Sequence, residues 1–165
     1  MKTNTSKRIL FITYSAIIAA LYTALTFVAA AMGLSSGAIQ VRLSEALTVL
    51  PMLTPAAVPG LTIGCLISNI LTGCIPVDVI FGTVATLIGA VGTRLLRKKH
   101  PVIAVLPPVL SNALIVPWVL KFGYGLEEAV PYFMLTVGAG EVISCGILGL
   151  IMYYAIRRRK LFKEL

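Results

Sequence analysis

Charged side chains are scarce in this sequence. Of 165 residues, 14 are basic and six are acidic, whereas 58% are apolar, and the mean hydropathy is +0.97. So few polar groups could not cover the surface of a water-soluble domain with this apolar content. The composition therefore excludes an ordinary soluble domain and predicts an integral membrane protein, with lipid as the solvent around its helices.

Residues and motifs for catalysis or metal binding are also few. The chain has one histidine, and Cys65, Cys74 and Cys145 are isolated in apolar sequence without CxxC spacing, which does not fit the usual zinc and disulfide patterns. It contains neither the GxxxxGK[ST] phosphate loop of ATPases nor the HExxH motif of zinc proteases. We therefore expect no ATPase or other enzyme activity, no metal site and no cofactor.

The basic residues lie next to apolar segments and not in a nucleic-acid-binding patch. Three clusters hold 12 of the 14 basic residues: Lys2, Lys7 and Arg8; Arg94, Arg97, Lys98 and Lys99; and Arg157, Arg158, Arg159, Lys160 and Lys163. Loops that are rich in Lys and Arg face the cytoplasm in membrane proteins. The positions of these clusters therefore predict that both termini lie in the cytoplasm. They also account for the net charge of +8, so we expect no nucleic-acid partner.

Six apolar segments are predicted as helices: residues 9–32, 42–54, 58–71, 77–96, 102–120 and 130–156. A crossing takes roughly 20 apolar residues, so we expect an all-α integral membrane protein, a six-transmembrane-helix bundle forming one membrane domain. Pro55 and Pro59 separate two short segments, which could instead form a re-entrant pair and leave four spans; the charge pattern agrees with both counts. The first segment is too long for the core of a cleaved signal peptide, so a retained helix is expected.

Three candidate site residues lie inside predicted spans: Glu141, Asn112 and Asn69. Glu141 lies well within the last span, with no basic residue in reach on the same helix. A charge in hydrocarbon is costly and is retained where it pairs or lines a polar pathway. Glu141 is therefore the first candidate for ligand binding, with protonation or pairing across helices as the alternative. Asn112 and Asn69 could hydrogen-bond a heterocycle, although amides also join helices in membrane bundles.

Other candidates lie nearer the ends of the helices. Arg42 and Glu45 are three residues apart, which predicts an ion pair along one helix face near the outer surface. Asp78 falls in the first turn of a predicted helix, where capping and ligand binding compete. Trp118 and Tyr124 are expected in an aromatic belt, although either ring could stack on a flat ligand.

Ala16, Ala20 and Ala24 recur at intervals of four in the first span. Side chains four residues apart lie on one face of a helix, so these alanines form a stripe that lets another helix approach closely. The stripe packs either within this chain or against a partner protein. The spacing alone does not choose between the two.

Four stretches in this order resemble the QueT family: residues 41–51 (VRLSEALTVLP), 59–65 (PGLTIGC), 106–113 (LPPVLSNA) and 137–141 (VGAGE). Members of this family are substrate-binding (S) components of energy-coupling factor (ECF) transporters. The resemblance implies a six-helix, multi-pass S component in the bacterial plasma membrane, which works with one transmembrane scaffold subunit (EcfT) and two ATPase subunits. It also implies that the alanine stripe docks on that module.

The substrate class that the resemblance implies is the 7-deazaguanines, above all 7-aminomethyl-7-deazaguanine (prequeuosine 1). Its guanine edge carries adjacent N–H donors, and its aminomethyl group is cationic near neutral pH. A carboxylate can accept both edge donors side by side. We therefore expect Glu141 at the guanine edge, Asn112 at the carbonyl and ring-nitrogen side, and Glu45 or Asp78 at the ammonium. Asn69, Arg42 and Trp118 complete the predicted site.

Two other functions are compatible with the sequence. The chain could be an S component for another vitamin-like nutrient, which a binding assay with a panel of ligands would reveal. It could also be a standalone secondary carrier or channel, in which Glu141 is a proton or ion site. Transport by the chain alone in liposomes would favour that function, and a membrane enzyme is a distant third.

Overall fold

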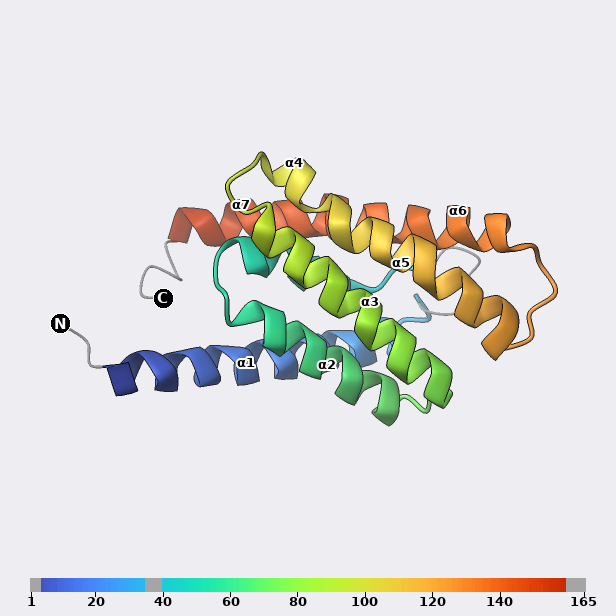
Figure 1. Cartoon of the computed structure of the whole chain (residues 1–165), viewed down its shortest axis with the longest axis horizontal. Helices are drawn as coiled ribbons and strands as arrows, with labels where there is room; N and C mark the ends of the chain where they lie inside the picture. Colours follow the sequence, from blue (N-terminus) through green and yellow to red (C-terminus); the bar gives the residue numbers. More distant parts are fainter. Residues whose placement is uncertain (1–3, 35–39, 160–165) are drawn as a thin grey trace.

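A computed structural model describes residues 4–34 and 40–159 of the protein (Figure 1). Within these ranges every regular element is a helix, which confirms the all-α prediction. The longer helices are α1 (Asn4–Ala31), α2 (Ala57–Leu71), α3 (Pro76–Leu95), α5 (Leu106–Trp118), α6 (Val130–Glu141) and α7 (Gly149–Arg159). The shorter elements are η1 (Leu43–Met52), α4 (Pro101–Ala104), η2 (Val119–Gly123) and η3 (Val142–Leu148).

Four continuous helical stretches are long and apolar enough to cross a membrane: Asn4–Ala31, Pro76–Leu95, Pro101–Gly123 and Val130–Arg159. η1 and α2 are shorter apolar helices of 10 and 15 residues. All six predicted segments are therefore helical, but only four have the length of a membrane span. η1 and α2 are the pair that the sequence allowed to be either two short spans or a re-entrant pair.

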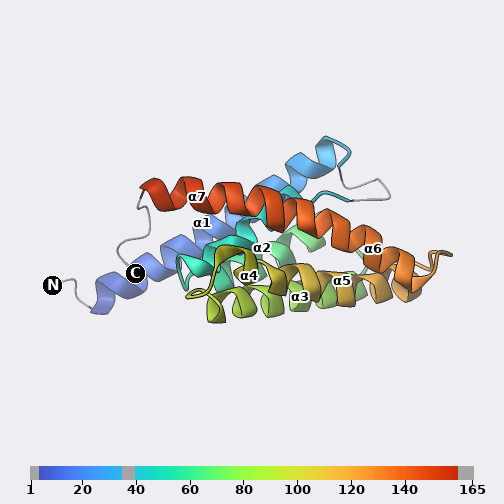
Figure 2. The ribbon, with the colours of Figure 1, turned by 90° about the horizontal axis from the view of Figure 1, so that it is seen from above.

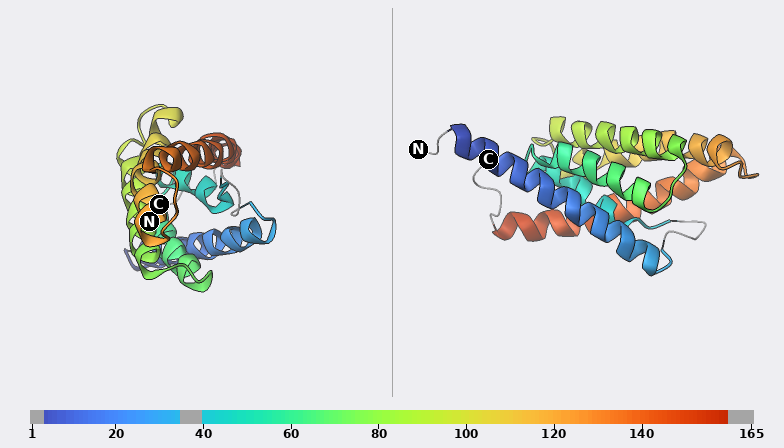
Figure 3. Two further views of the ribbon diagram at one scale, coloured as in Figure 1. Left: turned by 90° about the vertical axis from the view of Figure 1, so that its right-hand side faces the viewer. Right: turned by 90° about the horizontal axis from the view of Figure 1, so that it is seen from below.

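η1 is a 3₁₀-helix that lies inside the bundle. Residues 44–52 are all buried, and η1 contacts α1, α2, α3, η3 and α7. Figure 3 (left) shows η1 in teal, with the longer helices around it. Pro51 lies at its end and Pro55 follows. Because proline lacks the N–H that would continue a helix, the chain turns there and returns as α2.

Close packing between α1 and α2 depends on two glycines of α2. A Cβ atom on Gly60 would lie 2.8 Å from the Ser15 carbonyl oxygen, and a Cβ atom on Gly64 would lie 2.8 Å from Tyr22 Cβ. Two glycines four residues apart leave one helix face bare, so the backbones approach directly. Ser15 Oγ also donates a hydrogen bond to the Ala56 carbonyl at 2.9 Å. These contacts fix which face of α1 is buried.

The alanine stripe lies on a different face of α1. Ala16, Ala20 and Ala24 are exposed, whereas Ile18 and Tyr22 are buried. The stripe therefore does not pack within the part of the chain that the structure describes. Among the described residues, the internal alternative that the spacing left open is therefore wrong.

The two ends of the bundle differ in charge. The first turn of α1, the α3–α4 connection and the last turn of α7 lie at one end, on the left in Figures 1 and 2. This basic end carries the described members of all three clusters, and Arg94 Nη1 donates to the Pro51 carbonyl there at 3.1 Å. Lys2, Lys160 and Lys163 lie outside the described residues. The shared end agrees with an even number of crossings between the clusters.

Candidate ligand-binding site

A cavity of about 360 Å³ lies at the end of the bundle opposite the basic end. Its walls come from the last turns of α1 and α2, the first turn of α3, the residues before η1 and the segment after η2. The side chains that line it include Tyr22, Arg42, Asn69, Asp78 and Tyr124. This volume suits a small molecule, and the polar groups could fix its orientation.

Asp78 and Tyr124 join two parts of the cavity wall. The Tyr124 hydroxyl donates to Asp78 Oδ2 at 2.8 Å. Burial and this hydrogen bond raise the pKa of the Tyr124 hydroxyl, so it stays protonated and keeps its role as donor. Asp78 Oδ1 makes no hydrogen bond to the residues that the structure describes. The sequence indicated an aromatic belt or stacking on a ligand for Tyr124 but not this hydrogen bond, because Asp78 lies 46 positions away.

Asn69 lies beside Asp78 in the cavity wall. A Cβ atom on Gly82 would lie 3.1 Å from Asn69 Nδ2 and 3.4 Å from Asp78 Oδ1. Both polar groups therefore occupy the space over this glycine, one turn of α3 beyond Asp78. Asn69 Nδ2 donates to Cys65 Sγ at 3.6 Å, a weak interaction. The Asn69 amide is thus available to a ligand in the cavity.

Arg42 lines the cavity from the position just before η1. Its backbone is extended, with φ −98° and ψ 101°, and its N–H donates to Ser144 Oγ at 3.1 Å. The prediction of an Arg42–Glu45 ion pair is wrong, because Arg42 forms no ion pair with any described residue. Arg42 lies outside the helix, so the two side chains do not share a helix face. The Arg42 guanidinium lies within electrostatic range of Glu141, Glu45 and Asp78.

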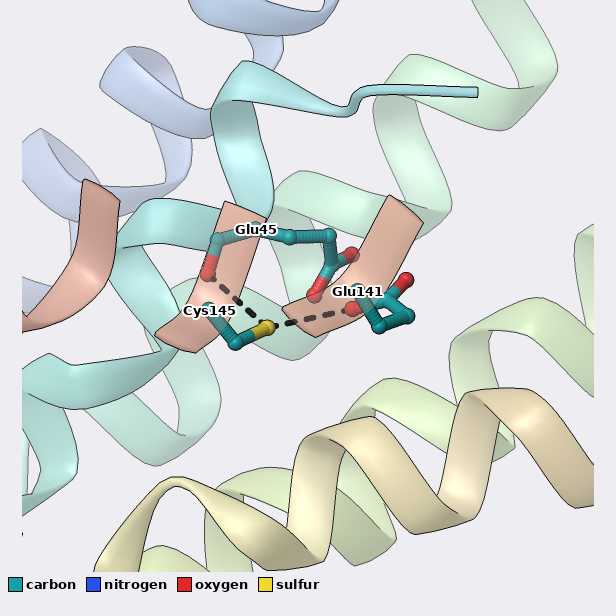
Figure 4. Close-up of side chains that lie close together, drawn as sticks. All are labelled: Glu45, Glu141 and Cys145. Atoms are coloured by element: carbon teal, nitrogen blue, oxygen red, sulfur yellow. Dashed lines mark hydrogen bonds between the residues drawn. The ribbon is translucent and has the colours of Figure 1, made fainter. Parts of the chain in front are cut away.

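Deeper in the bundle, Tyr22, Glu45, Thr48, Glu141 and Cys145 form a buried polar cluster. The Tyr22 hydroxyl donates to Glu45 Oε1, and Cys145 Sγ donates to Glu141 Oε2 at 3.1 Å. Thr48 Oγ1 donates to Cys145 Sγ at 3.2 Å. Figure 4 shows the carboxylates of Glu45 and Glu141 close together, with Cys145 next to both. The sequence indicated only a space-filling role for Cys145, although its i, i+4 spacing from Glu141 could have revealed the contact.

Two polar atoms in or near this cluster lack a partner. Glu45 Oε2 and Asn112 Nδ2 are buried and make no hydrogen bond to any described residue. The Asn112 side chain lies beside the Glu141 carboxylate, but its Nδ2 does not reach the geometry of a hydrogen bond. Glu45 is 0% exposed and Glu141 is 4% exposed. Glu45, Glu141 and Asn112 do not line the cavity directly. Because unsatisfied buried polar atoms are costly, the cluster has capacity for a ligand, an ion or a water molecule.

Trp118 lies apart from the other predicted site residues. It is 51% exposed and stacks on Phe122, with ring centroids 5.9 Å apart. It lines an apolar groove between α3 and α5 and not the polar cavity. This position suits a ring that faces the membrane, as the aromatic-belt alternative predicted.

The arrangement is suited to a small, polar, cationic ligand. Three carboxylates, those of Glu45, Asp78 and Glu141, lie in or near the cavity with a single guanidinium, that of Arg42. A positive charge on the ligand would offset this excess of carboxylates. Glu45, Glu141 and Cys145 each also place one possible ligand atom within 4.8 Å of the others, a spacing that a metal ion could bridge.

The sequence of this chain is similar to those of known transporters. A family model described as "QueT transporter" matches residues 12–158. The "Queuosine precursor transporter QueT" of Lactococcus lactis subsp. cremoris (strain MG1363) is 42% identical over 73 residues, which is 44% of this chain and 43% of that protein. The match thus spans less than half the length of this relative. No solved structure matches the chain. Because the family model covers almost the whole chain, the protein belongs to the QueT transporter family.

Proposed function

We propose that the protein is the substrate-binding component of an ECF-type ABC transporter for a queuosine precursor. Its family supports a role in transport, and the Lactococcus lactis relative is named a queuosine precursor transporter. The chain has no phosphate loop, so we assign ATP hydrolysis to two partner ATPases, coupled through the scaffold subunit EcfT. The ligand is a 7-deazaguanine, with prequeuosine 1 as the first candidate.

The polar cavity next to buried carboxylates is the observation that carries this ligand class. The guanine edge and the aminomethyl group lie at opposite ends of prequeuosine 1, and each suits a carboxylate. Glu141 accepts the two edge donors, and Asn112 hydrogen-bonds the carbonyl side. Arg42 connects the two regions, because it lines the cavity and interacts electrostatically with Glu141. Asn69 contributes from the cavity wall.

We also propose six membrane crossings with both termini in the cytoplasm. η1 begins beside the cavity and ends near the basic end, where the Pro51 carbonyl accepts from Arg94, and α2 returns to the cavity. At roughly 2 Å per residue, its ten residues span about 20 Å, most of the hydrocarbon core. In cysteine-accessibility labelling, residues 123–128 should react from outside and residues 97–100 from inside. Labelling of residues 97–100 from outside would contradict this topology.

The exposed alanine stripe of α1 is the proposed contact with EcfT in the bacterial plasma membrane. Ala16, Ala20 and Ala24 present small side chains on the outer face of α1. Small residues let a second helix pack closely within a bilayer, where the hydrophobic effect contributes little to association. A helix of the scaffold subunit could therefore pack along this face without disturbing the contact between α1 and α2.

Uptake by proteoliposomes tests the proposed function. Vesicles that contain the protein, EcfT and both ATPases should take up prequeuosine 1 when the ATPases are supplied with ATP. Vesicles that contain the protein alone should not. Transport by the protein alone would favour a secondary carrier, with Glu141 as an ion site. Uptake of a different nutrient, and of no 7-deazaguanine, would assign another substrate.

A further inference from the structure

Two carboxylates could accept the positive charge of the proposed ligand: Glu45 in the buried cluster and Asp78 in the cavity wall. We propose that Asp78, held by Tyr124 and flanked by Asn69, is the ammonium subsite, and that it selects an aminomethyl group over neutral 7-substituents. This inference rests on the proposed function, because it concerns the same ligand. It gives Asp78 a role in specificity and leaves Glu45 a structural role.

Glu45 is poorly placed to bind an ammonium group. Its side chain is fully buried, and Oε1 already accepts the Tyr22 hydrogen bond. Glu45 Oε2 is unbonded, but Glu45 does not line the cavity. An ammonium at Glu45 would therefore share the space within 4.8 Å of Glu141 with the guanine edge.

The shape of the ligand supports the same choice. Glu45 and Glu141 each place a carboxylate oxygen within 4.8 Å of the other (Figure 4). In prequeuosine 1 the edge donors and the ammonium lie at opposite ends of the fused ring. If Glu141 accepts the guanine edge, the ammonium points away from Glu141 and therefore away from Glu45 as well.

Asp78 resembles Glu45 in that a tyrosine hydroxyl holds one carboxylate oxygen and the other is unbonded, but unlike Glu45 it lies in the cavity wall. It lines the cavity and is 8% exposed. Tyr124 fixes Oδ2 with a hydrogen bond of 2.8 Å, while Oδ1 is unbonded within the described ranges and lies next to Asn69 over Gly82. A carboxylate that is fixed through one oxygen and open at the other is a preorganised acceptor for an ammonium group. The Asn69 amide oxygen can accept a second ammonium N–H.

The test compares two ligands that differ in the charge of the 7-substituent. The purified full-length protein is titrated by calorimetry with prequeuosine 1 and with 7-cyano-7-deazaguanine, whose nitrile is neutral. In Asp78→Asn the affinity for prequeuosine 1 should fall by about tenfold or more, because a charge-assisted hydrogen bond is lost. The affinity for the nitrile should stay within about twofold, since the guanine-edge contacts persist. Glu45→Gln tests the rival carboxylate: it can alter both affinities through its contact with Glu141, but it should leave the ratio of the two affinities unchanged.

An unchanged preference in Asp78→Asn, or a lost preference in Glu45→Gln, would overturn the assignment. If Asp78→Asn does not fold, Tyr124→Phe provides a second measurement, because it releases Oδ2 without removing the charge. In Tyr124→Phe the ratio of the affinities for prequeuosine 1 and the nitrile should fall by about threefold or more, and an unchanged ratio would overturn the assignment. A wild-type protein that binds neither ligand would refute the proposed function itself, so the two failures are distinguishable.

Discussion

Glu141→Gln alters the carboxylate that we assign to the guanine edge while preserving its shape. Glu141 Oε2 accepts the hydrogen bond from Cys145 Sγ at 3.1 Å, and Oε1 has no hydrogen bond to a described residue. If the glutamine oxygen keeps the contact with Cys145, the amide NH₂ replaces Oε1. That NH₂ would then face a donor of the ligand. The opposite orientation of the amide breaks the contact with Cys145 instead.

The expected loss of affinity follows from this mismatch. Replacing a charge-assisted acceptor by a donor that faces another donor costs at least about 2 kcal/mol, or more than tenfold in affinity. The free energy of unfolding should change little, because Glu141 is buried without an ion pair to any described residue. Neutralising such a carboxylate removes a desolvation cost, which offsets the altered hydrogen bond and the lost attraction to Arg42.

Calorimetric titration with prequeuosine 1 measures this effect, and thermal unfolding in detergent checks that the variant is folded. Glu128→Gln is the matched control, because it makes the same chemical change at an exposed residue between α5 and α6. It should bind as the wild-type protein does. Unchanged affinity in a folded Glu141→Gln protein would refute the assignment, and the guanine edge would have to be sought elsewhere in the cavity.

Two further substitutions test the packing of α1. Ala20→Phe should prevent co-purification with EcfT while binding of prequeuosine 1 by the isolated protein persists, and Ala155→Phe, at an exposed alanine of α7, should affect neither. Equal loss of assembly and binding in Ala20→Phe would mean that the stripe supports the fold. Gly64→Ala should lower stability by about 1–3 kcal/mol in thermal unfolding, because the new Cβ would lie 2.8 Å from Tyr22 Cβ. Gly138→Ala should not, since the new Cβ would lie 3.7 Å from Ala113 Cβ, an ordinary contact, and equal effects would contradict this packing.

Much of the helical framework could be predicted, because hydropathy and proline positions act locally. The structure has helices in all six predicted segments, and the pair that flanks Pro55 is the pair that is too short for an ordinary span. Less predictable was the 3₁₀ form of η1. Its burial among other helices compensates for weaker hydrogen-bond geometry, and that burial depends on contacts far apart in the sequence.

The site was harder to predict because its contacts join distant parts of the chain. A carboxylate within an apolar span made Glu141 recognisable, and the structure adds Tyr22 and Cys145 to its surroundings. The Asp78–Tyr124 hydrogen bond had no local pattern to reveal it. Helical spacing gave a wrong ion pair for Arg42, because that residue precedes the helix on which the spacing argument depends.

Direct binding of a 7-deazaguanine is the measurement that tests the central claim most closely. The purified wild-type protein, without EcfT or ATPases, is titrated by calorimetry with prequeuosine 1 and, in parallel, with guanine. We predict saturable one-to-one binding of prequeuosine 1 and weaker binding of guanine, which lacks the cationic aminomethyl group. A folded protein that binds no 7-deazaguanine, or that binds guanine equally well, would contradict the account.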